Sequence, residues 1–198
     1  MAHVFLLSPA RVDGRRAQIL FNPKATFDLA VRLRSDQGVP IGEVFSFLSG
    51  LYFRGKLAYA TRFNAAATFV ITTDRGLTTP DTRIRLDDLR AFGAVDIAAA
   101  DDRFTNPLRR DAERILRDLP SDACVVLLGS IATGKYADVL TSVFGERLLF
   151  PTDFVGRGDM SRGGLLLRCV DEARELAYQP VVGAVRRGSR PPKLERRR

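Results

Sequence analysis

Short apolar runs alternate along the chain with segments in which apolar residues recur at helical spacing. The runs of strand length are residues 3–8 (HVFLLS), 68–73 (TFVITT), 124–128 (CVVLL) and 147–150 (RLLF). Their near-continuous apolar character is typical of strands that are covered on both faces. The alternation predicts an α/β fold: a three-layer sandwich with a largely parallel central sheet, Rossmann-like in its organisation.

Helices are predicted at residues 25–34, twice within 41–63, and at 86–92, 106–119, 135–144 and 161–177. Asn106 and Pro107 suit a helix start, because Asn caps the first turn and Pro needs no amide partner there. Residues 17–21 fit either a strand or a turn of helix, and residues 94–97 fit a short strand.

The 198 residues, 45% of them hydrophobic and 27% charged, predict one folded domain. The net charge of +8 is unevenly placed, because residues 186–198 (RRGSRPPKLERRR) carry seven basic residues and one acid, giving +6, and leave +2 for residues 1–185. We therefore predict a domain over 1–185 and a basic disordered tail over 186–198. The tail is either a solubilising end or a nonspecific phosphate-binding arm.

Several classes of protein are made improbable by what the sequence lacks. The single histidine, His3, argues against histidine-based triads and histidine-rich metal sites, and Cys124 and Cys169 form no CxxC pair. No apolar run approaches the roughly 18 residues of a membrane span. We expect a cytoplasmic protein with no membrane partner, no metal and no resident cofactor.

The most specific motif is GSIATGKY, residues 129–136, between a predicted strand and a predicted helix. Its GxxxxGK spacing matches a phosphate-binding loop, but Tyr136 stands where such loops use Ser or Thr to bind magnesium. Three interpretations remain: a nucleotide-hydrolysing loop, an anion-binding turn without magnesium, and a plain turn. As an anion site it would use Gly129, Ser130, Lys135 and Tyr136.

A second glycine-rich turn, FVGRGDMSRGG, occupies residues 154–164 after the last predicted strand. Arg157 and Arg162 could bind a phosphate or carboxylate, and Ser161 could donate a hydrogen bond. Asp159 is a candidate acid or base, and the alternative is an ion pair with a neighbouring arginine. Because parallel strands present their carboxyl ends at one edge of a sheet, we expect this turn and residues 129–136 to lie together.

Two further segments carry candidate chemistry. Asp74 follows the strand at 68–73, where it is a second candidate acid or base or else a turn cap. Residues 49–59 (SGLYFRGKLAY) interleave aromatic residues with Arg54 and Lys56, which fits either contacts to a nucleotide or an amphipathic helix with its basic residues in water.

The segment ITTDRGLTTPDTRI, residues 71–84, resembles a strand-to-loop motif of Rossmann-like bacterial and phage proteins of unknown function, some associated with 7-deazaguanine modification. These proteins are distantly similar to the uracil-DNA glycosylase-like fold, including the corresponding domain of archaeosine synthase. GSIATGKYADVL and FVGRGDMSRGGLLLR resemble a motif pair of bacterial conserved proteins. The resemblance implies a three-layer α/β sandwich with a base or phosphate site at the carboxyl edge. The chain lacks the water-activating and histidine motifs of uracil-DNA glycosylases.

The sequence thus predicts a protein that binds a nucleotide, a nucleic acid or another phosphorylated ligand at the turns around Gly129 and Gly156. A base-processing, glycosylase-like enzyme fits these parts, with Asp74 or Asp159 as acid or base. A non-catalytic DNA- or RNA-binding module and a protein-interaction module are the alternatives. The oligomeric state is left open.

Overall fold

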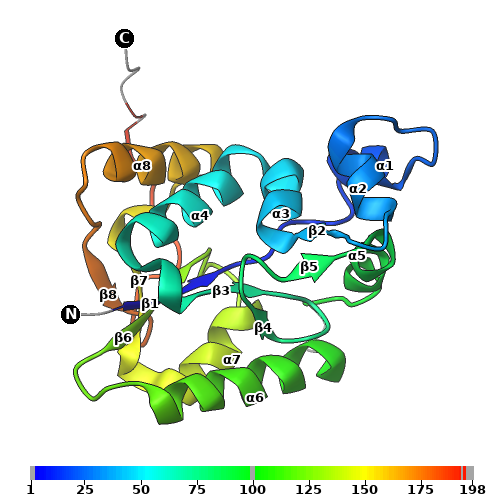
Figure 1. Ribbon diagram of the computed structural model, residues 1–198. Helices are drawn as coiled ribbons and strands as arrows, with labels where there is room; N and C mark the ends of the chain where they lie inside the picture. Colours follow the sequence, from blue (N-terminus) through cyan, green and yellow to red (C-terminus); the bar gives the residue numbers. More distant parts are fainter. Residues whose placement is uncertain (1–2, 99–100, 193, 195–198) are drawn as a thin grey trace.

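The computed structural model describes residues 3–98, 101–192 and 194 (Figure 1). A six-stranded sheet runs through the described part of the chain. Its spatial order is β4 (Leu77–Thr78), β3 (Thr68–Ile71), β1 (His3–Leu7), β6 (Cys124–Leu128), β7 (Leu148–Pro151) and β8 (Tyr178–Pro180). The four central strands are parallel, and the two edge strands are antiparallel to their neighbours.

Helices cover both faces of this sheet (Figure 1). One face carries α3 (Ile41–Ser49), α4 (Leu51–Asn64) and α8 (Asp159–Asp171), and the other carries α6 (Asp102–Asp118) and α7 (Lys135–Phe144). A peripheral group contains α1 (Arg15–Phe21), α2 (Asp28–Arg34), α5 (Leu86–Gly93) and the two-stranded pair β2 (Val39–Pro40) and β5 (Arg83–Ile84). Single 3₁₀ turns are η1 (Ala65–Ala67), η2 (Gly145–Arg147) and η3 (Thr152–Phe154).

The alternation of side chains along β1 divides the core into two clusters. Phe5 and Leu7 pack with the α3, α4 and α8 side, whereas Leu6 packs with the α6 and α7 side, and all three are fully buried. Successive residues of a strand point to opposite faces, so an apolar run in a central strand supplies both clusters at once. The predicted α/β class with a mostly parallel sheet is confirmed.

Several predicted boundaries are corrected. Residues 94–97 form turns in place of the predicted strand, with Val95 packed into the α6 and α7 cluster. Residues 17–21 belong to helix α1, so the helical alternative holds for them. Helix α6 starts at Asp102, because the Asp101 carboxylate accepts a hydrogen bond from the Arg103 amide at 2.9 Å and caps the helix earlier than Asn106 would. Pro107 lies inside that helix.

The last helix is shorter than predicted at its end. It runs from Asp159 to Asp171 and stops where Ala173 adopts a left-handed conformation, with φ at 50°. The Arg174 amide then donates to the Cys169 carbonyl at 3.0 Å, which closes the helix end. The chain turns back into β8, an antiparallel edge strand that the sequence analysis did not predict.

The order of the parallel strands creates a crevice at one edge of the sheet. From β1 the chain moves outward to β3, then crosses to the other side of β1 to form β6 and β7. The segment that follows β1 therefore leads toward β3, and the segment that follows β6 leads toward β7 on the other side of β1, which leaves a gap between the two segments. Ligands of open α/β sheets bind outside the carboxyl ends of strands at such a point.

Helices α4 and α8 cross with their backbones in close contact. A Cβ atom on Gly163 would lie 2.6 Å from the Leu51 carbonyl oxygen, and one on Gly55 would lie 2.7 Å from the Gly163 carbonyl oxygen. Neither helix has room there for any residue but glycine. This crossing fixes where the first turn of α8 lies relative to α4.

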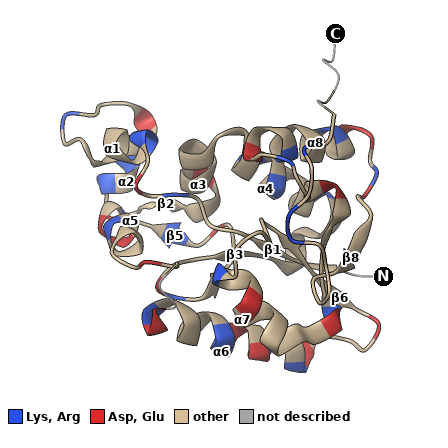
Figure 2. Ribbon diagram, turned by 180° about the vertical axis from the view of Figure 1, so that it is seen from behind, with Lys and Arg blue, Asp and Glu red and all other residues tan. Residues whose placement is uncertain are grey.

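Charges on the body are mixed, as expected from its small net charge. Figure 2 shows Lys and Arg interspersed with Asp and Glu along α6. Beyond Val185, residues 186–192 and 194 have no regular secondary structure, and Arg186 forms an ion pair with Asp138 at 2.7 Å. The disorder predicted for the tail stays a prediction. In the described ranges, no helix combines the length and the apolar character needed to cross a bilayer.

Candidate functional site

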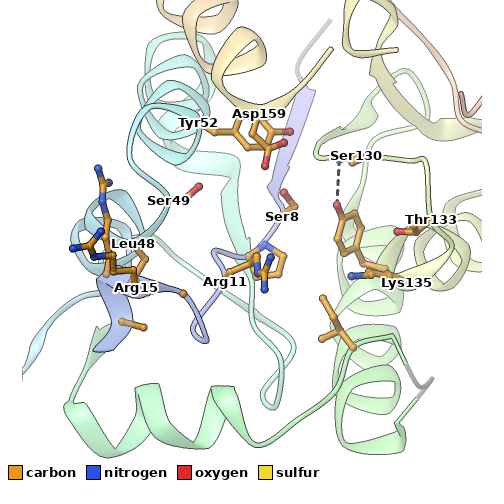
Figure 3. A pocket seen from close by; sticks show the side chains of 16 residues that line it. Ser8, Arg11, Arg15, Leu48, Ser49, Tyr52, Ser130, Thr133, Lys135 and Asp159 are labelled. Atoms are coloured by element: carbon orange, nitrogen blue, oxygen red, sulfur yellow. Dashed lines mark hydrogen bonds between the residues drawn. The ribbon is translucent and has the colours of Figure 1, made fainter. Parts of the chain in front are cut away.

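A cleft of about 570 Å³ lies at the carboxyl ends of β1 and β6. Six segments contribute to it: the loop from β1 into the first turn of α1, the end of α3, the start of α4, Ile97 between α5 and α6, the turn from β6 into α7, and the start of α8. In Figure 3, Ser8 lies between Tyr52 and Asp159 on one side and Ser130 and Lys135 on the other. The cleft therefore occupies the crevice that the strand order creates.

The side chains at the opening of the cleft are mainly basic. Arg11, Arg15, Arg16 and Lys135 line it, against one lining carboxylate, Asp159. Arg11 is paired with Asp13 at 2.7 Å. Among the ion pairs of the described residues, none involves Arg15, Arg16 or Lys135, which are exposed. Positive charge in a cleft with low-dielectric walls attracts anions.

Two helices of ten and thirteen residues begin at the cleft. The first residue of α7 is Lys135 and the first of α8 is Asp159, and both line the cleft. The first amides of a helix have no partner within the helix and carry partial positive charge, so they add to the attraction for an anion.

A buried lysine lies behind the floor of the cleft. Lys56 is 1% exposed, and its Nζ donates to the Ser8 carbonyl oxygen at 2.6 Å and to the Ser8 Oγ at 2.8 Å. The rings of Tyr52 and Phe53 pack against the amine, with centroids at 4.5 Å and 4.8 Å. Burial lowers the pKa of Lys56 to about 7, because the ammonium ion has lost its water.

Two tyrosine hydroxyls stand near Ser8. The Tyr136 hydroxyl accepts a hydrogen bond from the Ser130 amide at 3.1 Å, and burial raises its pKa. Gly129 leaves space for this arrangement, since a Cβ there would lie 2.9 Å from the Ser8 Cβ and 3.1 Å from the Tyr136 hydroxyl. Burial also raises the pKa of Tyr52, so both phenols are neutral donors at physiological pH.

The Tyr52 hydroxyl is buried and has no hydrogen-bond partner of ordinary geometry among the described residues. A buried hydroxyl without a partner is unfavourable, and Tyr52 is one of the residues that line the cleft. It is therefore a donor that a ligand can use.

Arg162 positions the start of α8. Its guanidinium is largely buried and donates twice to the Phe154 carbonyl, at 3.0 Å and 3.1 Å. It also pairs with Asp159 at 3.3 Å across one turn of the helix. The Asp159 side chain is 68% exposed. Asp159 therefore forms an ion pair with Arg162 and also presents a carboxylate to the cleft.

The structure brings part of the predicted site together. Ser130, Lys135, Tyr136 and Asp159 line one cleft, and Gly129 lies against Ser8 beside it. The two glycine-containing turns are therefore neighbours in space, through Asp159 of the second.

The other candidates lie elsewhere. Arg157 donates to the Ser161 Oγ at 3.2 Å and to the Pro192 carbonyl at 3.4 Å, and neither Arg157 nor Ser161 lines the cleft. Arg162 is behind the cleft wall. Asp74 pairs with its neighbour Arg75 at 3.0 Å, outside the cleft.

The floor of the site, formed by Ser8 and Lys56, is not predicted by any motif of the sequence. Ser8 was assigned to a strand only, although it is the residue that follows the central parallel strand. The pattern of residues 49–59 predicts Lys56 either in water or against a nucleotide, yet its spacing with Tyr52, Tyr59 and Ala60 places it on the buried face of α4. A charged residue at apolar helical spacing was the available signal.

Comparison with known proteins gives no information about the site. No protein-family model, no curated protein sequence and no solved structure matches the chain.

Proposed function

We propose that the chain binds a small phosphorylated ligand of the nucleotide class in the cleft between β1 and β6. The observation that supports this most is the set of three exposed cations, Arg15, Arg16 and Lys135, which line one cleft and form no ion pair among the described residues. Guanidinium and ammonium groups bind phosphate oxygens through charge-assisted hydrogen bonds. The strand order supports a Rossmann-like interpretation of the fold, because the cleft lies at the point where such sheets bind nucleotides.

The cleft has room for more than a phosphate group. An adjoining hollow of about 660 Å³ is lined by Thr73 and Phe92 and shares Arg11 and Lys135 with it. The phosphate would lie against the cations, and the rest of the ligand would extend toward the end of β3. Asp159 would then be the carboxylate able to hydrogen-bond a ribose or base, or to activate water in a base-processing reaction.

A nucleic-acid-binding module is the second candidate, and the basic tail favours it. Residues 186–198 carry +6, and such a segment binds polyphosphates through counterion release, with strong dependence on salt. This function needs the tail, whereas a nucleotide cleft needs Arg15 and Lys135.

One pair of matched variants separates the two functions. The double variant Arg15→Gln/Lys135→Gln removes two charges from the cleft, and Arg187→Gln/Arg190→Gln removes two exposed charges beyond Val185. We expect the cleft variant to bind adenosine monophosphate at least about tenfold more weakly by calorimetry, and the tail variant to stay within about twofold of wild type. Equal affinity of the cleft variant and wild type would refute the proposal. Loss of single-stranded DNA binding in the tail variant alone would support the second candidate.

A further inference from the structure

We propose that Ser8 is a nucleophile and Lys56 its general base, and that the cleft carries out acyl transfer on an ester or thioester whose remote part bears a phosphate. The inference rests on the proposed function for the remote part only. The reacting groups are identified independently, by a contact between a buried amine and a serine hydroxyl at the cleft floor.

The geometry supports a proton transfer between these two side chains. As an ammonium, Lys56 donates to both oxygens of Ser8. As a neutral amine, Lys56 can keep its bond to the Ser8 carbonyl at 2.6 Å while its lone pair accepts the hydroxyl proton across the same 2.8 Å contact. A base within hydrogen-bond reach of a serine hydroxyl is the arrangement that nucleophilic catalysis requires.

The surroundings of Lys56 favour the neutral amine near physiological pH. The ammonium is packed between two aromatic rings, and no carboxylate among the described ion pairs contacts it. Of the charged groups around it, Asp159 of α8 raises its pKa and Arg162 of α8 lowers it, and burial outweighs both. The tyrosines that face the same space, Tyr52 of α4 and Tyr136 of α7, are neutral because burial raises their pKa values.

The distribution of charge in the cleft favours an acyl group over a phosphoryl group as the reacting centre. The side chains around Ser8 are an amine, phenols and the Asp159 carboxylate, whereas the cations Arg15, Arg16 and Lys135 are exposed. A tetrahedral acyl intermediate develops one oxyanion, which a single neutral donor such as the Tyr52 hydroxyl can stabilise. The exposed cations would hold the phosphate of the remote part.

The reaction is balanced with water as the co-reactant. The neutral amine of Lys56 takes the hydroxyl proton, Ser8 Oγ bonds to the acyl carbon, and the carbonyl π pair moves onto oxygen. When the intermediate collapses, the alcohol or thiol leaves and takes the proton from Lys56. Water then attacks the seryl ester and gives one proton to the neutral amine of Lys56. When this intermediate collapses, the acid is released and Lys56 returns the proton to Ser8 Oγ.

A fluorophosphonate probe tests the nucleophile directly on the full-length protein. We expect mass spectrometry to find the label on Ser8, with a labelling rate that rises between pH 6 and 8 and then levels off, because only the neutral amine is a base. Lys56→Arg keeps a cation but provides no base, and should slow labelling at least about 100-fold. Ser121→Ala, at an exposed serine away from the cleft, should label as wild type does.

The outcomes separate the two proposals. The absence of label on wild-type Ser8 from pH 6 to 9 overturns the dyad. A labelling rate of the wild-type protein that does not change with pH overturns it as well. Both measurements use the wild-type protein, so neither depends on the folding of a variant. Adenosine monophosphate should protect Ser8 from the probe if the cleft binds it. Labelling of Ser8 without such protection would support the dyad and count against nucleotide binding. Nucleotide binding without labelling would support the nucleotide site and overturn the dyad.

Discussion

Gly163→Ala is expected to destabilise the protein by about 3 kcal/mol or more, and Gly163→Val to prevent folding. The added Cβ would lie 2.6 Å from the Leu51 carbonyl oxygen and 2.8 Å from the Tyr52 Cα. Both are backbone atoms of a helix, so relief requires α4 and α8 to move apart as rigid bodies. The measurement is the free energy of unfolding in urea, compared with wild type at the same pH.

The adjacent glycine of α8 is the matched control. A Cβ on Gly164 would meet only the Leu194 side chain, at 3.5 Å, which is an ordinary contact. Gly164→Ala should therefore leave stability unchanged or raise it by about 0.5–1 kcal/mol, because alanine favours the helix. If Gly163→Ala and Gly164→Ala were equally stable, the close crossing of α4 and α8 would be wrong, and with it the placement of Asp159 beside Tyr52.

The stability of the protein should rise with pH through the neutral range because of Lys56. Its pKa is about 7 when folded, against 10.5 for the unfolded side chain. Between these values the unfolded state binds the extra proton, so unfolding becomes less favourable as pH rises. Integration from pH 7 to pH 9 gives a gain of about 2 kcal/mol from this one group.

Lys56→Met should abolish that gain, whereas Arg54→Met should keep it. Both variants remove one positive charge from α4, but Arg54 is exposed and Lys56 is buried. The difference in unfolding free energy between pH 7 and pH 9, measured by urea denaturation, isolates Lys56, because His3 and Cys169 contribute equally to all three proteins. The same pH slope in Lys56→Met and wild type would show that Lys56 titrates normally.

The parts of the fold that sequence predicted are those set by local pattern. The apolar run CVVLL has the length and β-branched content of a buried strand, and Lys135–Phe144 follows it as an amphipathic helix. The parts it missed depend on tertiary contacts or on a competing cap. Strand β8 has three residues, YQP, and exists because it pairs with β7. Asp101 begins α6 ahead of Asn106 because its carboxylate meets an amide two residues on.

The residues of the candidate site also fall into those that a local motif predicts and those that depend on tertiary contacts. Lys135 and Ser130 could be named from a glycine-containing turn between strand and helix, since that motif is local. The pairing of Ser8 with Lys56 could not, because they are 48 residues apart and their contact depends on how α4 packs over β1. Arg157 had the residue type for anion binding, but its guanidinium is directed to Ser161 and Pro192. Residue type alone does not tell which way a side chain leaves a turn.

A crystal structure with adenosine monophosphate tests the central claim most directly. We expect the phosphate oxygens within about 3.2 Å of Lys135 Nζ and of the guanidinium of Arg15 or Arg16, as charge-assisted hydrogen bonds require, between the ends of β1 and β6. A nucleotide bound against the residues beyond Val185, with the cleft holding only water, would contradict the account.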